Sequence, residues 1–325
     1  MKHILFVADP LASFKPYKDS TYAMMRAAQA RGHGVWACHP QDMSWRKDGT
    51  VEAQVQSIVL RDITPSPEAP KATWFDSTAH ERRALADFDA IVMRKDPPFD
   101  AEYIYATHLL EQAERDGARV FNSPRALRDH PEKLALMQFA QWAPPTLVTR
   151  SAAEVRAFHA EHGDIICKPL DGMGGAGIFR VGADGMNLGS IIETLNQDGA
   201  QTLMVQRYLP QIVEGDKRVL VIDGEPVPFA LARIPQGGEV RGNLAAGGKG
   251  VAMPLTDAER EIAQAVGPTL AARGLLLVGL DVIGGHLTEV NVTSPTCFQE
   301  ITAQTGFDVA GRFMDALEAA SSFKV

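Results

Sequence analysis

The first third of the chain alternates short apolar runs with stretches of helical spacing. The apolar runs are long enough for buried strands, and Asp19 and Gly32 suit the start and the end of the first helix. The predicted strands are 3–8, 34–39, 89–94 and 119–122, and the predicted helices are 21–31 and 101–115. Strands that alternate with helices form parallel sheets, so we expect an α/β, doubly wound, Rossmann-like domain over residues 1–130.

Polar residues follow three of these strands. Ligands of doubly wound sheets lie beyond the carboxyl ends of the strands, which makes these residues candidates for a binding cleft. They are Asp9, Arg94-Lys95-Asp96 and Asn122-Ser123. The alternative is that they are ordinary polar loop residues, and for each residue considered alone this interpretation is favoured.

From about residue 131 the pattern changes to mixed α+β with antiparallel strand pairs. Ser151 with Glu154, and Thr256 with Glu259, have the spacing of capping boxes and predict helices that end at Gly163 and Gly274. The turn Asp223-Gly224 predicts a hairpin. The predicted strands are 165–168, 178–181, 202–209, 216–222, 226–234, 275–283 and 287–292.

A glycine-rich loop, GMGGAG at 172–177, separates two of these strands. It satisfies the dinucleotide-binding pattern, but a Rossmann loop opens a helix, whereas Ile178 to Val181 continues as a strand. A strand, a glycine loop and a strand suit backbone N–H groups that fold over the phosphates of ATP, within reach of Lys168. The alternative is a glycine-rich hairpin turn with a solvated lysine.

A second glycine-rich segment covers residues 235–250. It fails the P-loop pattern, because Asn243 stands at the first glycine position and Gly250 follows Lys249 where Ser or Thr is required. A long loop inside a compact domain is usually a functional lid or a linker. Arg241 and Lys249 favour a lid that closes over anionic groups.

Three oxygen-bearing residues near the end of the chain suggest a metal site. Glu289 and Asn291 share one face of a strand, and Asp281 lies on the partner strand. A loop over 284–286 would pair Asp281 with Glu289 on that face, whereas a two-residue turn would place Asp281 on the opposite face. Two carboxylates and an amide oxygen suit Mg²⁺, and a polar, solvated sheet face is the alternative.

Composition narrows the functional classes. The net charge of −8 disfavours a sequence-independent grip on nucleic acid. The apolar run 4–8 is too short for a signal peptide or a membrane span, so we expect a cytoplasmic protein without a membrane partner. The three cysteines are widely spaced, which fits a reducing compartment and provides no zinc site.

Six segments carry a resemblance that extends over nearly the whole chain. They are MRKDPPFD (93–100), LRDHPEKL (127–134), KPLDGMGGAGIFRV (168–181), EGDKRVLV (214–221), DGEPVPFALARIPQGGEVRGNLAAGGKG (223–250) and VGLDVIGGHLTEVNVTSPT (278–296). In order and spacing they resemble the prokaryotic-type glutathione synthetases of the ATP-grasp superfamily. The resemblance implies an ATP-grasp fold after the N-terminal substrate domain, with a lid subdomain at 131–210 and a catalytic subdomain at 211–325 that carries a mobile loop at 234–250.

The same resemblance implies ATP-dependent ligation of γ-glutamylcysteine to glycine in a homo-oligomer, with a tetramer as the family's form. It assigns Mg²⁺, or Mn²⁺ as the alternative, to Asp281, Glu289 and Asn291. The implied nucleotide contacts are Lys133, Lys168, Gly172, Gly174, Gly175, Gln206, Tyr208, Leu209 and Asp216. The implied peptide contacts are Arg94, Ser294, Pro295 and Thr296.

The chemistry adds catalytic candidates. A carboxylate is a poor electrophile, so the dipeptide must first take the γ-phosphoryl group of ATP as an acyl phosphate. Arg218 and Arg233, on two strands of one hairpin, are candidates for stabilising the oxyanion that forms when glycine attacks, and Arg241 is the candidate from the loop. Arginines on strands also form surface ion pairs.

Other functions remain open on the sequence. A D-alanyl dipeptide ligase or a glutamate-adding ligase is the nearest alternative within the fold. A nicotinamide-dependent oxidoreductase requires a helix after Gly177, and a non-catalytic nucleotide-binding module tolerates loss of the metal residues.

Overall fold

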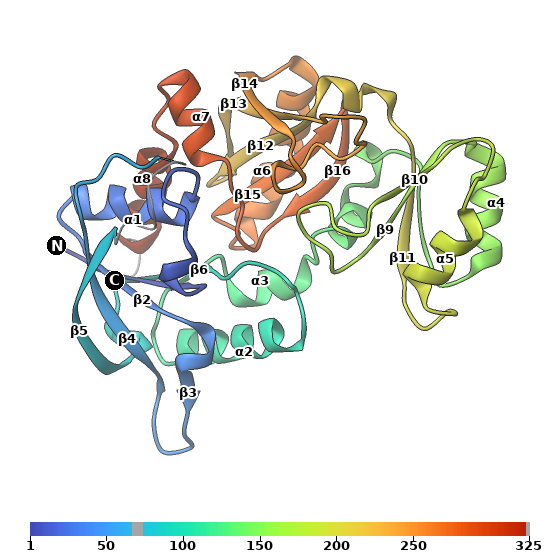
Figure 1. The fold of residues 1–325 in the computed structure, drawn as a ribbon. Helices are drawn as coiled ribbons and strands as arrows, with labels where there is room; N and C mark the ends of the chain where they lie inside the picture. The colour runs from blue at the N-terminus through green and yellow to red at the C-terminus, as the bar shows by residue number, and fades with distance from the viewer. Residues whose placement is uncertain (67–73, 323–325) are drawn as a thin grey trace.

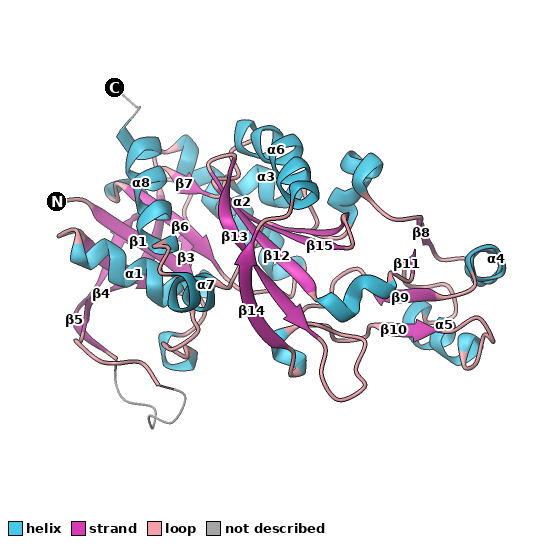
Figure 2. Ribbon diagram, turned by 90° about the horizontal axis from the view of Figure 1, so that it is seen from above, coloured by secondary structure: helices cyan, strands magenta, loops and turns pink. Residues whose placement is uncertain are grey.

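The computed structural model describes residues 1–66 and 74–322 and arranges them around three β-sheets. The N-terminal sheet lies at one end of the molecule, the third sheet in the middle and the second sheet at the other end (Figures 1 and 2). No helix in the described ranges is long and apolar enough to cross a membrane.

The N-terminal sheet contains the four predicted strands as a parallel core. Its hydrogen-bonded order is β3 (Met43–Trp45), β4 (Val51–Leu60), β2 (Gly34–Cys38), β1 (His3–Ala8), β6 (Ala90–Arg94) and β7 (Val120–Phe121), with β5 (Phe75–Ala84) paired to β4. The predicted strands pair in parallel, but the sheet as a whole is mixed, because β4 pairs antiparallel with β2, β3 and β5. The β5 segment is mostly polar and exposed, so its hydrophobic pattern did not mark it as a strand.

Helices cover both faces of this sheet. Helix α1 (Ser20–Ala30) packs Met24 in one apolar cluster with Ile4, whereas α2 (Ala101–Arg115) packs Leu110 in another with Leu5. Neighbouring residues of a strand point to opposite faces, so the predicted doubly wound arrangement is confirmed. The C-terminal helices α7 (Phe298–Thr305) and α8 (Val309–Ser322) return to the side of α1 (Figure 1).

The second sheet is antiparallel and has its own small core. Its order is β10 (Phe179–Val181), β9 (Ile165–Pro169), β11 (Leu203–Arg207) and β8 (Thr146–Thr149), with helices α4 (Ala152–His162) and α5 (Leu188–Asn196) packed on it. Ser151 caps α4, but the predicted capping box is incomplete: the Glu154 carboxylate accepts from the Thr149 hydroxyl instead of the Ser151 backbone.

The third sheet is also antiparallel. Its order is β14 (Lys249–Pro254), β13 (Glu225–Ile234), β12 (Asp216–Ile222), β15 (Leu277–Ile283) and β16 (His286–Asn291). The predicted turn joins β12 to β13, with φ of 52° at Asp223 and 79° at Gly224, as a type I′ hairpin requires. Helix α6 (Asp257–Ala272) packs against this sheet and begins with the predicted capping box of Thr256 and Glu259.

The remaining helical segments are short. Helix α3 (Pro124–Asp129) precedes an irregular 3₁₀ segment, η4 (Leu134–Trp142), and together they connect the N-terminal sheet to the second sheet. The other 3₁₀ turns are Leu11–Ser13, Pro40–Asp42, Leu85–Asp87, Pro210–Glu214 and Leu244–Ala246.

Candidate active site

The glycine-rich loop connects two paired strands of the second sheet. Strand β9 precedes it and β10 follows it, with Cys167 opposite Phe179. Gly174, Gly175 and Gly177 have φ of 63°, 86° and 71°, which glycine adopts at little cost. No helix begins after Gly177, so the prediction of a strand, a glycine loop and a strand is confirmed and the nicotinamide-binding alternative is wrong.

Two adjoining hollows lie between the second and third sheets. The central cavity has a volume of about 220 Å³, and the apolar slot has a volume of about 90 Å³. Both are lined by Lys168, Ile178, Asn243 and Glu289, so they form one continuous site. Gly172, Gly174 and Gly175 line the central cavity.

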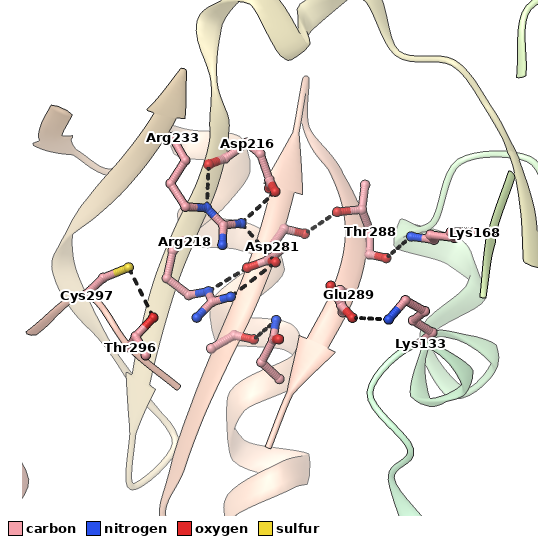
Figure 3. Close-up of polar contacts among 12 residues, drawn as sticks. Lys133, Lys168, Asp216, Arg218, Arg233, Asp281, Thr288, Glu289, Thr296 and Cys297 are labelled. Atoms are coloured by element: carbon pink, nitrogen blue, oxygen red, sulfur yellow. Dashed lines mark hydrogen bonds and ion pairs between the residues drawn. The ribbon is translucent and has the colours of Figure 1, made fainter. Parts of the chain in front are cut away.

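Two buried lysines lie where the hollows approach the glycine loop. Lys133 Nζ donates to Gly172 O at 2.7 Å and lies 3.0 Å from Glu289 Oε1. Lys168 Nζ donates to Thr288 O at 3.3 Å (Figure 3). Burial lowers the pKa of Lys168, and the negative charge of Glu289 opposes that effect. An entering phosphate would restore favourable charge around both ammonium groups.

Two buried arginines, one on β12 and one on β13, hold the carboxylate of Asp281 on β15. Arg218 Nε lies 2.6 Å from Asp281 Oδ1, and Arg233 Nη2 lies 2.9 Å from Asp281 Oδ2 (Figure 3). Burial opposes ionisation of Asp281, but the two guanidinium groups outweigh it and hold its pKa well below its usual range. These arginines line the central cavity and are not surface ion pairs.

The predicted metal residues lie on one face through an unexpected register. The turn between β15 and β16 has two residues, Gly284-Gly285, not the three that would directly align Asp281 with Glu289. A β-bulge at Thr288 adds one residue to β16 and restores the pair of Asp281 and Glu289. The carbonyl of this bulged residue is the one that accepts from Lys168.

The donor set fits a hard divalent cation. Asp281, Glu289 and Asn291 all line the central cavity. The amide nitrogen of Asn291 donates a hydrogen bond to Gly279 O at 3.3 Å, which leaves the amide oxygen free to bind a metal ion. In the described ranges no three His, Cys, Asp or Glu residues gather as a metal-binding group. Two carboxylates and one amide oxygen nevertheless suit Mg²⁺ bound together with phosphate oxygens.

The segment predicted to receive adenine lines the apolar slot. Gln206, Tyr208 and Leu209 lie there, and Gln206 Nε2 donates to Thr146 Oγ1 at 3.1 Å. The Arg180 guanidinium stacks 3.8 Å from the centre of the Tyr208 ring. Asp216 lines the same slot, where burial raises its pKa to about 6 against the opposing charge of Arg233.

The predicted peptide residues divide into two groups. Ser294, Pro295 and Thr296 line the central cavity. Arg94 lines neither hollow: it is 4% exposed and donates to Thr21 Oγ1 at 3.0 Å and to Pro295 O at 2.9 Å. Arg94 therefore holds the segment that lines the cavity and does not itself face either hollow, so its predicted contact with the peptide stays a prediction.

The second glycine-rich segment is shorter than predicted. Lys249 already belongs to β14, opposite Ile234, and lines neither hollow, so its predicted place in a lid over anions is wrong. Arg241 does line the apolar slot, and its Nη1 donates to Gly175 O at 3.2 Å. A Cβ atom on Gly175 would lie 2.7 Å from Asn243 Oδ1, so the two glycine-rich loops touch.

Sequence reasoning missed Glu132 as a site residue. Its side chain is half-buried and lines the central cavity, and its carboxylate accepts from Val292 N, Thr293 N and Thr293 Oγ1 at 3.0, 3.1 and 2.8 Å. Burial and the nearby Glu289 raise its pKa. Its position next to Lys133 in LRDHPEKL was the available signal, but the bonds to residues 292 and 293 depend on the fold.

Comparisons with known proteins give one family for both parts of the chain. The family model described as "Prokaryotic glutathione synthetase, N-terminal domain" matches residues 1–128, and "Prokaryotic glutathione synthetase, ATP-grasp domain" matches residues 132–306. A glutathione synthetase of Ralstonia nicotianae is 59% identical over 98% of this chain and 96% of its own length. One of Neisseria meningitidis serogroup A is 56% identical over 97% and 98%.

Solved structures show the same fold at low sequence identity. The ATP-grasp ligase PsnB, in complex with a minimal precursor, aligns with a TM-score of 0.61 at 20% identity and covers 98% of this chain and 99% of its own. The D-cycloserine synthetase DcsG aligns with a TM-score of 0.65 at 16% identity, over 98% and 99%. The chain thus shares its overall fold with these solved ATP-grasp structures.

Proposed function

This chain belongs to the prokaryotic glutathione synthetase family, and from that membership we propose how its residues carry out the reaction. It is an ATP-dependent ligase that joins a carboxylate to an amine, and its function is glutathione synthesis from γ-glutamylcysteine and glycine. The observation that carries the proposal is the convergence of four buried cationic side chains, Lys133, Lys168, Arg218 and Arg233, on one cavity bordered by the glycine loop.

The apolar slot receives the adenine of ATP, and the central cavity receives its phosphates. Gln206, Tyr208 and Leu209 border the base, and Asp216 lies in the same slot. Gly172, Gly174 and Gly175 let the backbone approach the phosphates closely. A Cβ atom on these residues would lie 3.0, 3.3 and 2.7 Å, respectively, from the nearest neighbouring atoms. Lys133 and Lys168 offset the phosphate charge.

Asp281, Glu289 and Asn291 hold Mg²⁺, or Mn²⁺ in its place. When bound, the ion offsets negative charge on phosphate oxygens. In the structure, Asp281 pairs with Arg218 and Arg233, and Glu289 pairs with Lys133.

Phosphoryl transfer activates the dipeptide. An oxygen of the cysteinyl carboxylate attacks the γ-phosphorus, the bond to the β,γ-bridging oxygen breaks, and ADP leaves as the acyl phosphate forms. The glycine amine then attacks the acyl carbon, phosphate departs, and the amine loses a proton. Arg218 and Arg233 stabilise the oxyanion of this second step, since both are buried and line the cavity.

The peptide is bordered by Ser294, Pro295 and Thr296. Arg241 connects the loop 235–248 to the glycine loop through its hydrogen bond to Gly175 O. Residues 1–130, 131–210 and 211–325 serve as the substrate, lid and catalytic parts. The enzyme works in the cytoplasm as a homo-oligomer.

The test is phosphate release from ATP with γ-glutamylcysteine, with and without glycine, alongside mass detection of glutathione. Equal amounts of phosphate and glutathione in the complete mixture support the proposal. Product from D-alanine or from glutamate addition, without product from γ-glutamylcysteine, would favour another ATP-grasp ligase.

A further inference from the structure

Four carboxylates line the central cavity, and one of them differs in its partners. Asp281 is paired with two arginines, Glu289 with Lys133, and Glu132 accepts three hydrogen bonds from residues 292 and 293. Asp96 forms no salt bridge with any described side chain, and only one of its two carboxylate oxygens, Oδ1, has a hydrogen-bond donor. Asp96 is exposed, and a cavity-lining carboxylate without a salt-bridge partner can receive a cationic group of the substrate.

Asp96 is held firmly in this position. Its own N–H donates to Asp9 Oδ2 at 2.9 Å, and the neighbouring Lys95 Nζ lies 3.0 Å from Asp9 Oδ1. The Ser294 hydroxyl donates to Asp96 Oδ1. The carboxylate therefore joins the end of β6 to the segment that follows β16 and is ordered before any substrate arrives.

Arg94 strengthens the same junction without a salt bridge to Asp96, although the negative charge of Asp96 opposes the lowering of the Arg94 pKa by burial. Its guanidinium is directed to Thr21 and to Pro295 O, and it makes no ion pair with Asp96. Arg94 is thus a positioning residue that holds residue 295 beside Asp96.

The rest of the cavity has the opposite charge. Lys133, Lys168, Arg218 and Arg233 line it and suit the ATP phosphates and the reacting carboxylate. The proposed dipeptide substrate carries an α-ammonium group at its glutamyl end, far along the molecule from its reacting cysteinyl carboxylate. The cavity likewise is lined both by these cations and by Asp96 with Ser294, and Asp96 has no salt-bridge partner among the described residues.

We propose that Asp96, oriented by Ser294, binds the α-ammonium group of the γ-glutamyl residue and so selects this dipeptide over acyl-cysteines that lack the amine. The inference rests on the proposed function and assigns a specificity residue to it. Glycine is excluded as the owner of the bound ammonium, because its amine must lose a proton and attack the acyl carbon.

The experiment compares γ-glutamylcysteine with glutarylcysteine, in which hydrogen replaces the amine. Wild-type kcat/KM for the natural dipeptide should exceed that for the analogue by about 10- to 100-fold, as expected for a hydrogen bond between charged groups. Asp96→Asn should reduce this ratio to near one, mainly through KM of the natural dipeptide, and should leave KM for glycine and ATP unchanged. Asp48→Asn, on an exposed side chain, removes the same charge elsewhere and should keep the wild-type ratio.

Ser294→Ala supplies a second variant should Asp96→Asn fail to fold, and it should reduce the ratio in part, because Asp96 loses its orienting donor. An equal fall of kcat/KM for both dipeptide substrates in Asp96→Asn, or a raised KM for glycine, would overturn this inference but not the proposed function. Wild-type enzyme that forms no peptide from γ-glutamylcysteine would instead overturn the proposed function.

Discussion

Lys133 Nζ lies 3.0 Å from Glu289 Oε1, which joins a proposed phosphate-binding lysine to a proposed metal ligand. Both side chains line the central cavity, and Glu289 borders the apolar slot as well. Each neutralises the other before substrates bind. Entry of ATP with its metal ion therefore exchanges one set of charge partners for another and leaves no buried charge alone.

Glu289→Gln should remove most of the metal-dependent turnover. The amide keeps the shape of the side chain but loses the charge that the metal ion requires, so we expect kcat to fall by about 100-fold or more. The measurement is kcat as a function of Mg²⁺ and Mn²⁺ concentration. The Gln variant should still fold, although buried Lys133 loses its charge partner, and a fully active Gln variant would refute the metal assignment.

Glu132→Ala should destabilise the junction between the segment before η4 and the end of β16. It leaves Val292 N, Thr293 N and Thr293 Oγ1 without their acceptor, so the free energy of unfolding should fall by about 1–3 kcal/mol. Urea unfolding measures this change.

Glu132→Gln keeps an acceptor oxygen and should lose less stability than Glu132→Ala. Glu161→Ala removes a carboxylate whose side chain is 74% exposed and should change little. Equal stability of all three variants would show that the hydrogen bonds of Glu132 are not needed.

An acyl-phosphate route predicts positional isotope exchange in ATP when γ-glutamylcysteine is present and glycine is absent, because the bridging oxygen is freed before the amine is needed. Lys168→Ala should slow this half-reaction, since the lysine acts on phosphate charge and not on the amine. Nuclear magnetic resonance of ¹⁸O-labelled ATP follows the exchange. Strict dependence of exchange on glycine would favour a concerted reaction.

The loop between β13 and β14 should protect the acyl phosphate from water. Joining Gly237 to Gly248 removes residues 238–247, including Arg241, and leaves a short hairpin loop between the paired residues Ile234 and Lys249. The fold and much of the ATP affinity should remain, while phosphate released per glutathione formed rises above one. An unchanged ratio together with an unchanged rate would make this segment a simple connection.

His130 should make stability dependent on mildly acidic pH. Its Nδ1–H donates to Ala126 O at 2.7 Å, and its Nε2 accepts from Arg273 Nη1 at 2.7 Å, so the folded state holds a neutral ring. Burial lowers its pKa, and the charge of Arg273 acts in the same direction. As pH falls through the ordinary histidine value, the unfolded chain takes up a proton before the folded chain does, so stability decreases.

His130→Asn, whose amide can still donate to Ala126, should lose less stability than wild type between pH 7 and 5.5. Urea unfolding at both pH values measures the difference. Parallel losses in the two proteins would exclude His130 as the source.

Much of the fold could be predicted because its signals are local. The buried strand 3–8, the capping residues Asp19 and Thr256, and the turn Asp223-Gly224 act through neighbouring residues, and the structure has each as predicted. Strand β5 could not be predicted, because its exposed polar side chains are held mainly by backbone pairing with β4.

The sequence by itself determined which residues form the site. They are a glycine loop between two strands, the lysines and arginines, and the oxygen-bearing residues Asp281, Glu289 and Asn291. Only the tertiary structure decided how these groups meet. The two-residue turn by itself would have placed Asp281 on the opposite face, and the bulge at Thr288 restores its pairing with Glu289. Likewise, Arg94 donates to Pro295 O while Asp96 lines the cavity and accepts from Ser294. These contacts join the end of β6 to the segment after β16, about 200 positions away, so local sequence could not predict them.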